Sequence, residues 1–143
     1  MIGLVLSCWA SAGCAAPESD LSKTPKYAST IGTYYRTKVD LYALGLYSTD
    51  GSNKVVKIWV SPFPATGPEV AYRHRIPEGQ HVRVLAVRKS FVLLENGLHF
   101  VVAMDGLNLP ADLEIIVPLY GELQETDGFL DADRFEKVSA PLP

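Results

Sequence analysis

The residues of this chain with the most reactive side chains are two cysteines and three histidines. His74, His81 and His99 stand singly, and zinc needs three or four converging ligands, so we expect ordinary core or surface histidines and no metal site. Cys8 and Cys14 leave three possibilities open, namely a disulfide, a reactive thiol or an attachment point. The chain has no G-x-S-x-G, H-E-x-x-H or glycine-rich phosphate loop, so we expect no catalytic residues, no cofactor and no enzyme activity.

Clustered carboxylates near the end of the chain raise the question of calcium, which selects oxygen ligands. The acidic residues are Asp127, Asp131, Asp133 and Glu136. An EF-type loop that starts at Asp131 would place Phe135 at a ligand position and lacks glycine at the sixth position. We therefore interpret 122–143 as a final short element and a solvated acidic tail.

Aromatic and basic residues occur together in the middle of the chain. Aromatic faces and guanidinium groups suit sugar rings, peptides or anionic polymers. The alternative is the ordinary composition of strands, in which aromatic side chains fill the pleats. The candidate binding residues are Trp59, Phe63, Tyr72, Arg73 and Arg75.

The first residues are typical of an export signal. Ile2 to Gly13 carry no charge, and Pro17, Glu18 and Asp20 follow. An apolar core of about 7–15 residues that ends in small side chains indicates a cleaved signal peptide, here over 1–13. No apolar run reaches the roughly 18 residues that a membrane-spanning helix needs.

Ser11-Ala12-Gly13-Cys14 resembles the lipobox of bacterial lipoproteins, in which small residues precede an obligatory cysteine. The resemblance implies that Cys14 carries lipid, begins the mature chain and anchors it in a membrane. Ala15, rather than Asp, follows the cysteine, which in such proteins implies the outer membrane, facing the periplasm. Cys8 would leave with the signal, so Cys14 would have no partner for a disulfide. Ordinary signal-peptidase cleavage near Ala15 or Ala16, or an uncleaved segment, remain alternatives.

Alternating apolar and polar residues dominate from residue 39 to residue 102. Val55–Val60 places Val56, Ile58 and Val60 on one face and Lys57 and Trp59 on the other. Asn96-Gly97 lies between two apolar runs, and this dipeptide favours a type I′ hairpin turn. Turn residues separate the other runs.

This pattern predicts an all-β fold, either a small antiparallel barrel or a β-sandwich. The stretch Ile76-Pro77-Glu78-Gly79-Gln80-His81-Val82-Arg83-Val84-Leu85 is similar to bacterial Src-homology-3-like envelope domains. The expected organisation is a signal peptide over 1–13, a lipidated cysteine and flexible tether over 14–30, an all-β domain over 31–121 and an acidic tail over 122–143. The tether is expected because 15–30 is small, polar and interrupted by prolines.

Charge is divided unevenly along the chain, whose net charge is −3. Residues 34–89 hold nine Lys and Arg against four acidic residues, and 95–137 hold ten acidic residues against two basic ones. Either the basic part faces an anionic partner or the two parts face each other. Nucleic acid is not expected for an exported acidic protein.

From these observations we expect a lipid-anchored cell-envelope protein whose β module binds a partner without catalysis. The expected partners are the membrane, through the lipid, and another envelope protein or a cell-wall component. The alternative is a freely secreted or periplasmic enzyme or inhibitor whose residues come together only in the fold.

Overall fold

The protein is all-β in the part that the computed structural model describes, which is residues 18–92, 95–119 and 130–142. The strands are β1 (Glu18–Asp20), β2 (Tyr34–Thr37), β3 (Leu41–Tyr47), β4 (Val55–Ser61), β5 (Val70–Ile76), β6 (His81–Val92), β7 (Glu95–Ala103), β8 (Ile115–Pro118) and β9 (Phe135–Val138). The prediction of an all-β fold is confirmed. Within these residues there is no helix with the length and apolar character to cross a bilayer.

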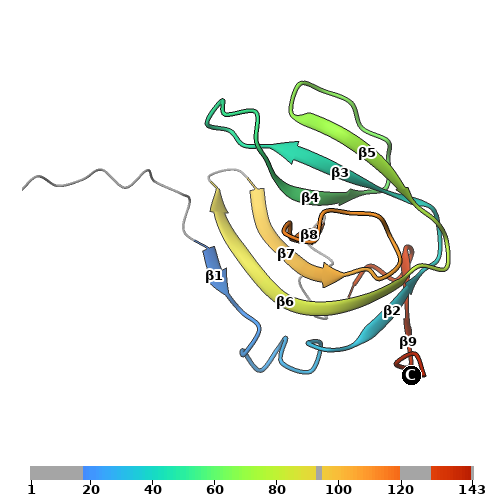
Figure 1. Ribbon diagram of the computed structural model, residues 1–143. Coiled ribbons are helices and arrows are strands. Elements are labelled where there is room, and N and C mark those ends of the chain that lie inside the picture. The colour runs from blue at the N-terminus through green and yellow to red at the C-terminus, as the bar shows by residue number, and fades with distance from the viewer. Residues whose placement is uncertain (1–17, 93–94, 120–129, 143) are drawn as a thin grey trace, which may run out of the picture.

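The nine strands form one open mixed sheet in the order β5-β3-β4-β8-β7-β6-β2-β9, with β1 paired to β6 (Figure 1). The finer expectation was a small antiparallel barrel or a β-sandwich, whereas the described strands form a single open sheet that is mixed, because β4 and β8 run parallel. A parallel pair needs a long connection between its strands. Here β5, β6 and β7 lie between β4 and β8 in the chain, and local strand patterns do not reveal such a pairing.

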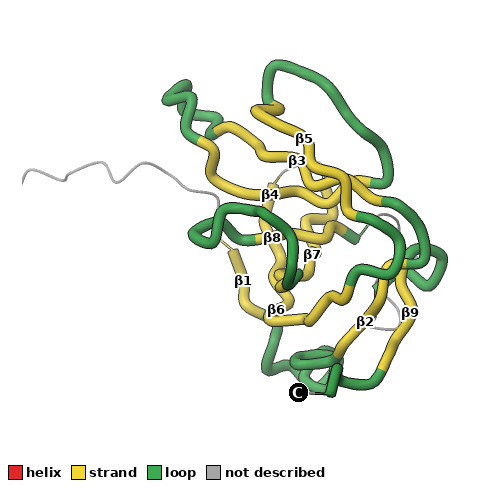
Figure 2. Tube along the Cα trace, turned by 45° about the vertical axis from the view of Figure 1, so that its right-hand side comes forward, coloured by secondary structure: helices red, strands yellow, loops and turns green. Residues whose placement is uncertain are grey.

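The sheet curves around one apolar core, so that β3, β4 and β5 lie on one side of it and β6 on the other (Figures 1 and 2). Inward side chains alternate along the strands, as Ile58 and Val60 do on β4. Val56, predicted on the same face, is 43% exposed, because it stands near the start of the strand. Phe100 on β7 and Ile76 on β5 are fully buried in the same core.

A sharp corner joins the two sides of the core. The antiparallel register Leu41↔Ile76 between β3 and β5 continues as Arg36↔His81 between β2 and β6. The two chain segments therefore form one long ribbon that bends at residues 38–40 and 77–80. Gly79 adopts a φ of 87°, which favours glycine, and its N–H donates to the Thr37 carbonyl at 2.8 Å.

The predicted hairpin exists, but its turn is not at Asn96-Gly97. β6 pairs with β7, and Phe91↔Asn96 and Ser90↔Gly97 are opposite one another inside the ladder. A Cβ on Gly97 would overlap the Ser90 carbonyl and lie 3.0 Å from Ser90 Cβ. Glycine is therefore required here by the close approach of two strands, and the register of these long strands outweighs the local turn preference.

The expected flexible tether over 14–30 needs correction for residues 18–30, which pack on the sheet. β1 pairs with β6, and the Leu21 N–H donates to the Val87 carbonyl at 2.8 Å. Two consecutive turns then bury Tyr27 to 5% exposure. The few apolar side chains of this segment are irregularly spaced, so no periodicity reveals their burial.

Residues 122–143 were expected to form a final short element and a solvated acidic tail; in the described part the short element is present as β9, but this part is packed on the fold and not a solvated tail. β9 pairs with β2, and Leu130 and Phe135 are buried in the core. Arg36 on β2 forms an ion pair with Glu136 on β9, and Arg88 pairs with Glu114 at 2.8 Å. The basic and acidic parts of the chain thus meet each other at these positions.

Candidate binding site

The predicted binding residues divide between the two faces of the sheet. Arg73 lies opposite Leu44, and Leu44 lies opposite Trp59, in the β5-β3-β4 ladder. Residues directly opposite one another share a face, so Arg73 and Trp59 lie on the outer face, away from the core. Arg75 is two residues from Arg73 and shares that face. We call Leu44, Trp59, Arg73 and Arg75 the outer arginine face.

Arg75 is oriented by Asp40 from the corner. The Arg75 Nη2 and Nε atoms donate to Asp40 Oδ2 at 2.6 and 3.0 Å, and the Glu78 N–H donates to Asp40 Oδ1 at 3.0 Å. The Glu78 N–H, followed by the Arg75 guanidinium, lowers the pKa of Asp40 below its ordinary value. The same pairing raises the pKa of Arg75, whose side chain nevertheless remains 65% exposed. Arg75 is a cation with a fixed direction and free access from solvent.

Arg73 contacts the loop between β4 and β5. Its Nη1 donates to the Pro64 carbonyl at 3.3 Å. Phe63, the neighbouring residue, is 70% exposed, and its N–H donates to Ser61 Oγ at 3.1 Å. Trp59 lies under the Lys57 ammonium, 5.6 Å from the ring centroid. The structure therefore brings Trp59, Arg73 and Arg75 to one face and places Phe63 on a loop that Arg73 contacts.

Tyr72 belongs to the opposite, inner face. It is directly across from Gly45, where a Cβ would lie 2.5 Å from Tyr72 Cζ, so the ring packs on the glycine. The Tyr72 hydroxyl is buried and has no hydrogen-bond partner among the described residues. Burial, and then the charge of Asp112, raise the pKa of Tyr72. The structure does not bring Tyr72 to the outer arginine face.

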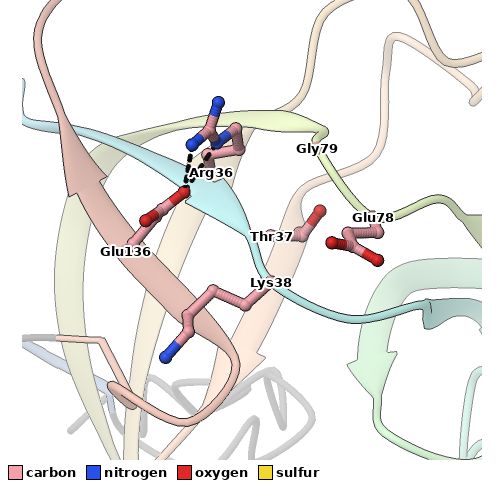
Figure 3. Close-up of a pocket in the computed structure, with 6 residues that line it drawn as sticks. All are labelled: Arg36, Thr37, Lys38, Glu78, Gly79 and Glu136. Carbon is pink, nitrogen blue, oxygen red and sulfur yellow. Dashed lines mark hydrogen bonds and ion pairs between the residues drawn. The ribbon is translucent and has the colours of Figure 1, made fainter.

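A shallow hollow at the corner was not predicted from the sequence (Figure 3). It has a volume of about 590 Å³ and is lined by Arg36, Thr37, Lys38, Glu78, Gly79 and Glu136. Its basic groups are engaged, because Arg36 Nε donates to Glu136 Oε1 at 2.7 Å and Lys38 Nζ donates to the Ala132 carbonyl at 2.7 Å. The sequence feature that could have indicated this hollow is the turn predicted at Pro77-Glu78-Gly79. The other side of the hollow is formed by β9, which lies in the segment predicted to be an acidic tail.

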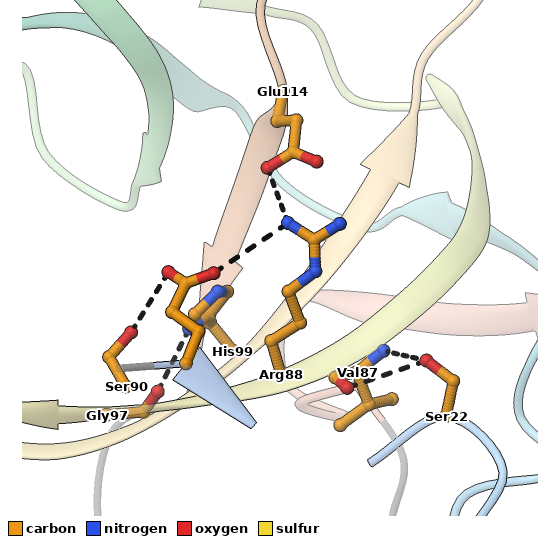
Figure 4. Close-up of polar contacts among 8 residues, drawn as sticks. Ser22, Val87, Arg88, Ser90, Gly97, His99 and Glu114 are labelled. Carbon is orange, nitrogen blue, oxygen red and sulfur yellow. Dashed lines mark hydrogen bonds and ion pairs between the residues drawn. The ribbon is translucent and has the colours of Figure 1, made fainter. Parts of the chain in front are cut away.

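A second polar cluster, also not predicted, surrounds Arg88 on β6 (Figure 4). Arg88 Nη1 lies 2.8 Å from Glu114 Oε2 and 3.9 Å from Glu18 Oε2. Buried His99 is across from Arg88, and its Nδ1 lies 2.9 Å from the Gly97 carbonyl. Within the part of the chain that the structure describes, its Nε2 has no hydrogen-bond partner. Through its ion pairs, Arg88 on β6 connects β6 to Glu18 on β1 and to Glu114 in the segment before β8.

Metal ligation has no candidate among the residues that the structure describes, where no group of three or more His, Cys, Asp or Glu converges. His74, His81 and His99 belong to β5, β6 and β7. Asp131 holds a turn, since its Oδ1 accepts the Asp133 N–H at 2.9 Å and its Oδ2 pairs with Arg134 at 3.1 Å. Cys14 and Asp127 lie outside the described residues.

The outer arginine face is the candidate site that best combines exposure with fixed geometry. Its two cations lie two residues apart on an end strand of the sheet, and Trp59 lies two strands away on the same face, across the buried Leu44. Compared with known proteins, the chain matches no family model, no curated relative and no solved structure.

Proposed function

We propose that this protein is a lipid-anchored protein of the bacterial cell envelope whose β module binds a partner without catalysis. The observation that carries the anchor is Ser11-Ala12-Gly13-Cys14 at the end of an uncharged apolar run. Its resemblance to a lipobox implies a thioether-linked diacylglycerol on Cys14. Because each buried methylene contributes about 0.8 kcal/mol, several acyl chains hold a protein firmly. Ala15 supports the outer membrane, facing the periplasm.

The start of β1 limits how far the module stands from such an anchor. Only Ala15, Ala16 and Pro17 separate Cys14 from Glu18. At about 3.3–3.6 Å per residue, this segment spans roughly 10–14 Å at most. A lipidated Cys14 would therefore hold the β1 side of the sheet close to the bilayer surface and leave the opposite side to meet a partner.

The partner in this proposal is another envelope protein or a cell-wall component. Support comes from the outer arginine face, where Arg75 is held by Asp40 and remains exposed. We also propose that the curved sheet acts as a small barrel of Src-homology-3-like kind. The continuous register of β3–β5 and β2–β6 around the corner supports this shape.

Metabolic labelling tests the anchor. Cells that express the full chain are grown with a labelled fatty acid, and the purified protein is compared with Cys14→Ser and with the matched control Cys8→Ser. We expect label in the wild type and in Cys8→Ser and none in Cys14→Ser, because only the Cys14 sulfur would carry lipid. Label retained by Cys14→Ser would contradict the anchor.

Intact mass of the mature protein separates the proposal from its alternative. A lipoprotein begins at Cys14 and carries added acyl mass. A mature chain that begins near Ala15 or Ala16 without acyl mass would instead indicate a freely secreted or periplasmic protein.

A further inference from the structure

β5 is an end strand of the sheet, and its only pairing partner among the described residues is β3 (Figure 1). An end strand leaves a row of backbone N–H and C=O groups unpaired, and such a row can pair with another extended chain. Natural sheets often protect their edges with covering loops, prolines or charges.

The register determines which backbone groups face outward. In an antiparallel ladder, residues alternate between pairs that exchange hydrogen bonds and pairs that do not. The Tyr47 N–H of β3 donates to the Glu69 carbonyl at 2.9 Å, so Tyr47 and every second residue before it on β3, down to Leu41, direct their backbone groups toward β5. Leu41 is opposite Ile76 in this ladder. Ile76, His74 and Tyr72 thus direct their backbone groups toward β3. Arg73 and Arg75 direct their N–H and C=O groups to the open edge.

The neighbouring loop does not pair with this edge. Pro62, Pro64 and Pro68 lie in the loop that precedes β5, and proline has no N–H to donate. The backbone hydrogen bonds described for the loop do not reach Arg73 or Arg75. The Val70 N–H donates to the Gly67 carbonyl at 3.1 Å, and the Glu69 carbonyl accepts the Tyr47 N–H of β3 at 2.9 Å. Arg73 and Arg75 therefore present their backbone groups without a partner in the described chain.

The side chains at this edge select the charge of a partner. Arg73 and Arg75 lie on the same outer face, and Asp40 neutralises only Arg75. A net positive charge therefore borders the edge. If an antiparallel strand were added at this edge, the two residues opposite Arg73 and Arg75 would be two positions apart in its sequence and would lie on the same outer face. Acidic side chains at these two positions would be favourable next to the arginines, and basic side chains would be unfavourable.

We propose that the open edge of β5 binds an extended acidic segment of another protein by strand addition. Main-chain hydrogen bonds to Arg73 and Arg75 would supply affinity, and acidic side chains at alternate positions, next to the two guanidinium groups, would supply specificity. This inference deepens the binding part of the proposed function and is independent of the lipid on Cys14. A second copy of this chain fits less well, because pairing β5 with β5 would bring arginines together.

The test uses the full chain and a short synthetic peptide that alternates valine and glutamate, with a matched peptide in which lysine replaces glutamate. Binding is measured by fluorescence anisotropy and amide exchange by NMR. We expect the acidic peptide to bind more tightly than about 1 mM and to slow exchange of the Arg73 and Arg75 amides. The lysine peptide should do neither.

Two variants separate the backbone contribution from the charge. Arg73→Pro removes the outward N–H, while Arg73→Ala removes only the guanidinium. We expect Arg73→Pro to bind the acidic peptide at least about tenfold more weakly than Arg73→Ala, a difference of about 1.4 kcal/mol.

Several results would overturn the proposal. These are equal binding by the two variants, equal binding of the two peptides, no binding of the acidic peptide up to about 1 mM, or binding without slower exchange at Arg73 and Arg75. Slower exchange that depends on protein concentration alone would show pairing between two copies. Fatty-acid labelling of Cys14 is unaffected by each of these results, so failure of the edge and failure of the anchor are distinguishable.

Discussion

Single polar residues hold the corner that orients the candidate site. Thr37 Oγ1 donates to the Pro77 carbonyl at 2.8 Å and accepts the Gln80 N–H at 2.9 Å. Asp40 accepts from both the Glu78 N–H and Arg75. These two side chains satisfy backbone groups at the bend, where the regular ladder is interrupted. Asp40 thereby links the geometry of the corner to the direction of Arg75.

Replacement of Asp40 by Asn should reduce stability in a pH-dependent way. The pKa of Asp40 is lowered in the folded protein, so its contribution is complete above the unfolded pKa of about 4 and is lost as pH falls through the folded pKa. We expect the melting temperature of Asp40→Asn to be lower than that of the wild type at pH 7, and the two melting temperatures to become equal in acid. Thermal melts of both proteins from pH 7 down into the acid range measure the difference. Asp105→Asn, an exposed aspartate after β7, is the control, and a gap that stays constant with pH would contradict the role of the carboxylate.

The elements differ in how well their local sequence describes them. β4 follows its predicted alternation, with Ile58 and Val60 inside and Lys57 and Trp59 outside. β5 was not singled out as a strand from the sequence, and its place at an end of the sheet follows from pairing with β3. The turn predicted at Asn96-Gly97 lies in the ladder instead. Position within the sheet, rather than local preference, decided both cases.

Proline substitutions along β5 should distinguish its two edges. His74→Pro removes an N–H that faces β3 and leaves a buried acceptor unpaired, which costs about 1–3 kcal/mol. Arg73→Pro removes an N–H that faces outward and should change the free energy of unfolding by less than about 1 kcal/mol, since proline is accepted at such edge positions. Urea unfolding of both variants, with His74→Ala as control, measures this. Equal losses at the two positions would contradict the derived register.

At the scale of the whole molecule, both ends of the described chain complete the core. Tyr27 comes from the segment before β2, and Leu130 and Phe135 come from the final segment. β9 also covers one edge of β2. The folded module therefore extends beyond the predicted boundaries of 31–121, at least to residues 18–30 before it and 130–138 after it.

Truncation after Arg134 should strongly destabilise the protein. It removes β9 and Phe135, which is 3% exposed, and loss of a buried phenylalanine side chain alone costs about 3–5 kcal/mol. This is a large part of the roughly 5–15 kcal/mol that stabilises a typical domain. Truncation after Val138 removes only the exposed end and should leave the melting temperature nearly unchanged. Equal melting temperatures for the two truncations would show that β9 contributes little.

The outer arginine face shows which of the candidate residues lie together in the fold and which neighbours could not be predicted from the sequence. The residue types and their concentration in the middle of the chain indicated Trp59, Arg73 and Arg75, and the structure brings these to one face. Alternation alone predicts that Tyr72 lies opposite Arg73 and Arg75, yet the grouping by composition placed it with them. Asp40 and the hollow at the corner could not be found, because their partners lie tens of residues away.

Local sequence was sufficient to predict the all-β class and the faces of strands such as β4, because the side-chain period of two is a local property of an extended backbone. The proposal for Cys14 likewise rests on local sequence. Tertiary structure alone decided the parallel β4–β8 pair, the packing of residues 18–30 and 130–138, and the open edge of β5. Each of these features depends on contacts between residues that are far apart in the chain. Such contacts form only when the free energy gained by packing exceeds the entropic cost of closing the loop between them, and a local sequence pattern contains no information on either quantity.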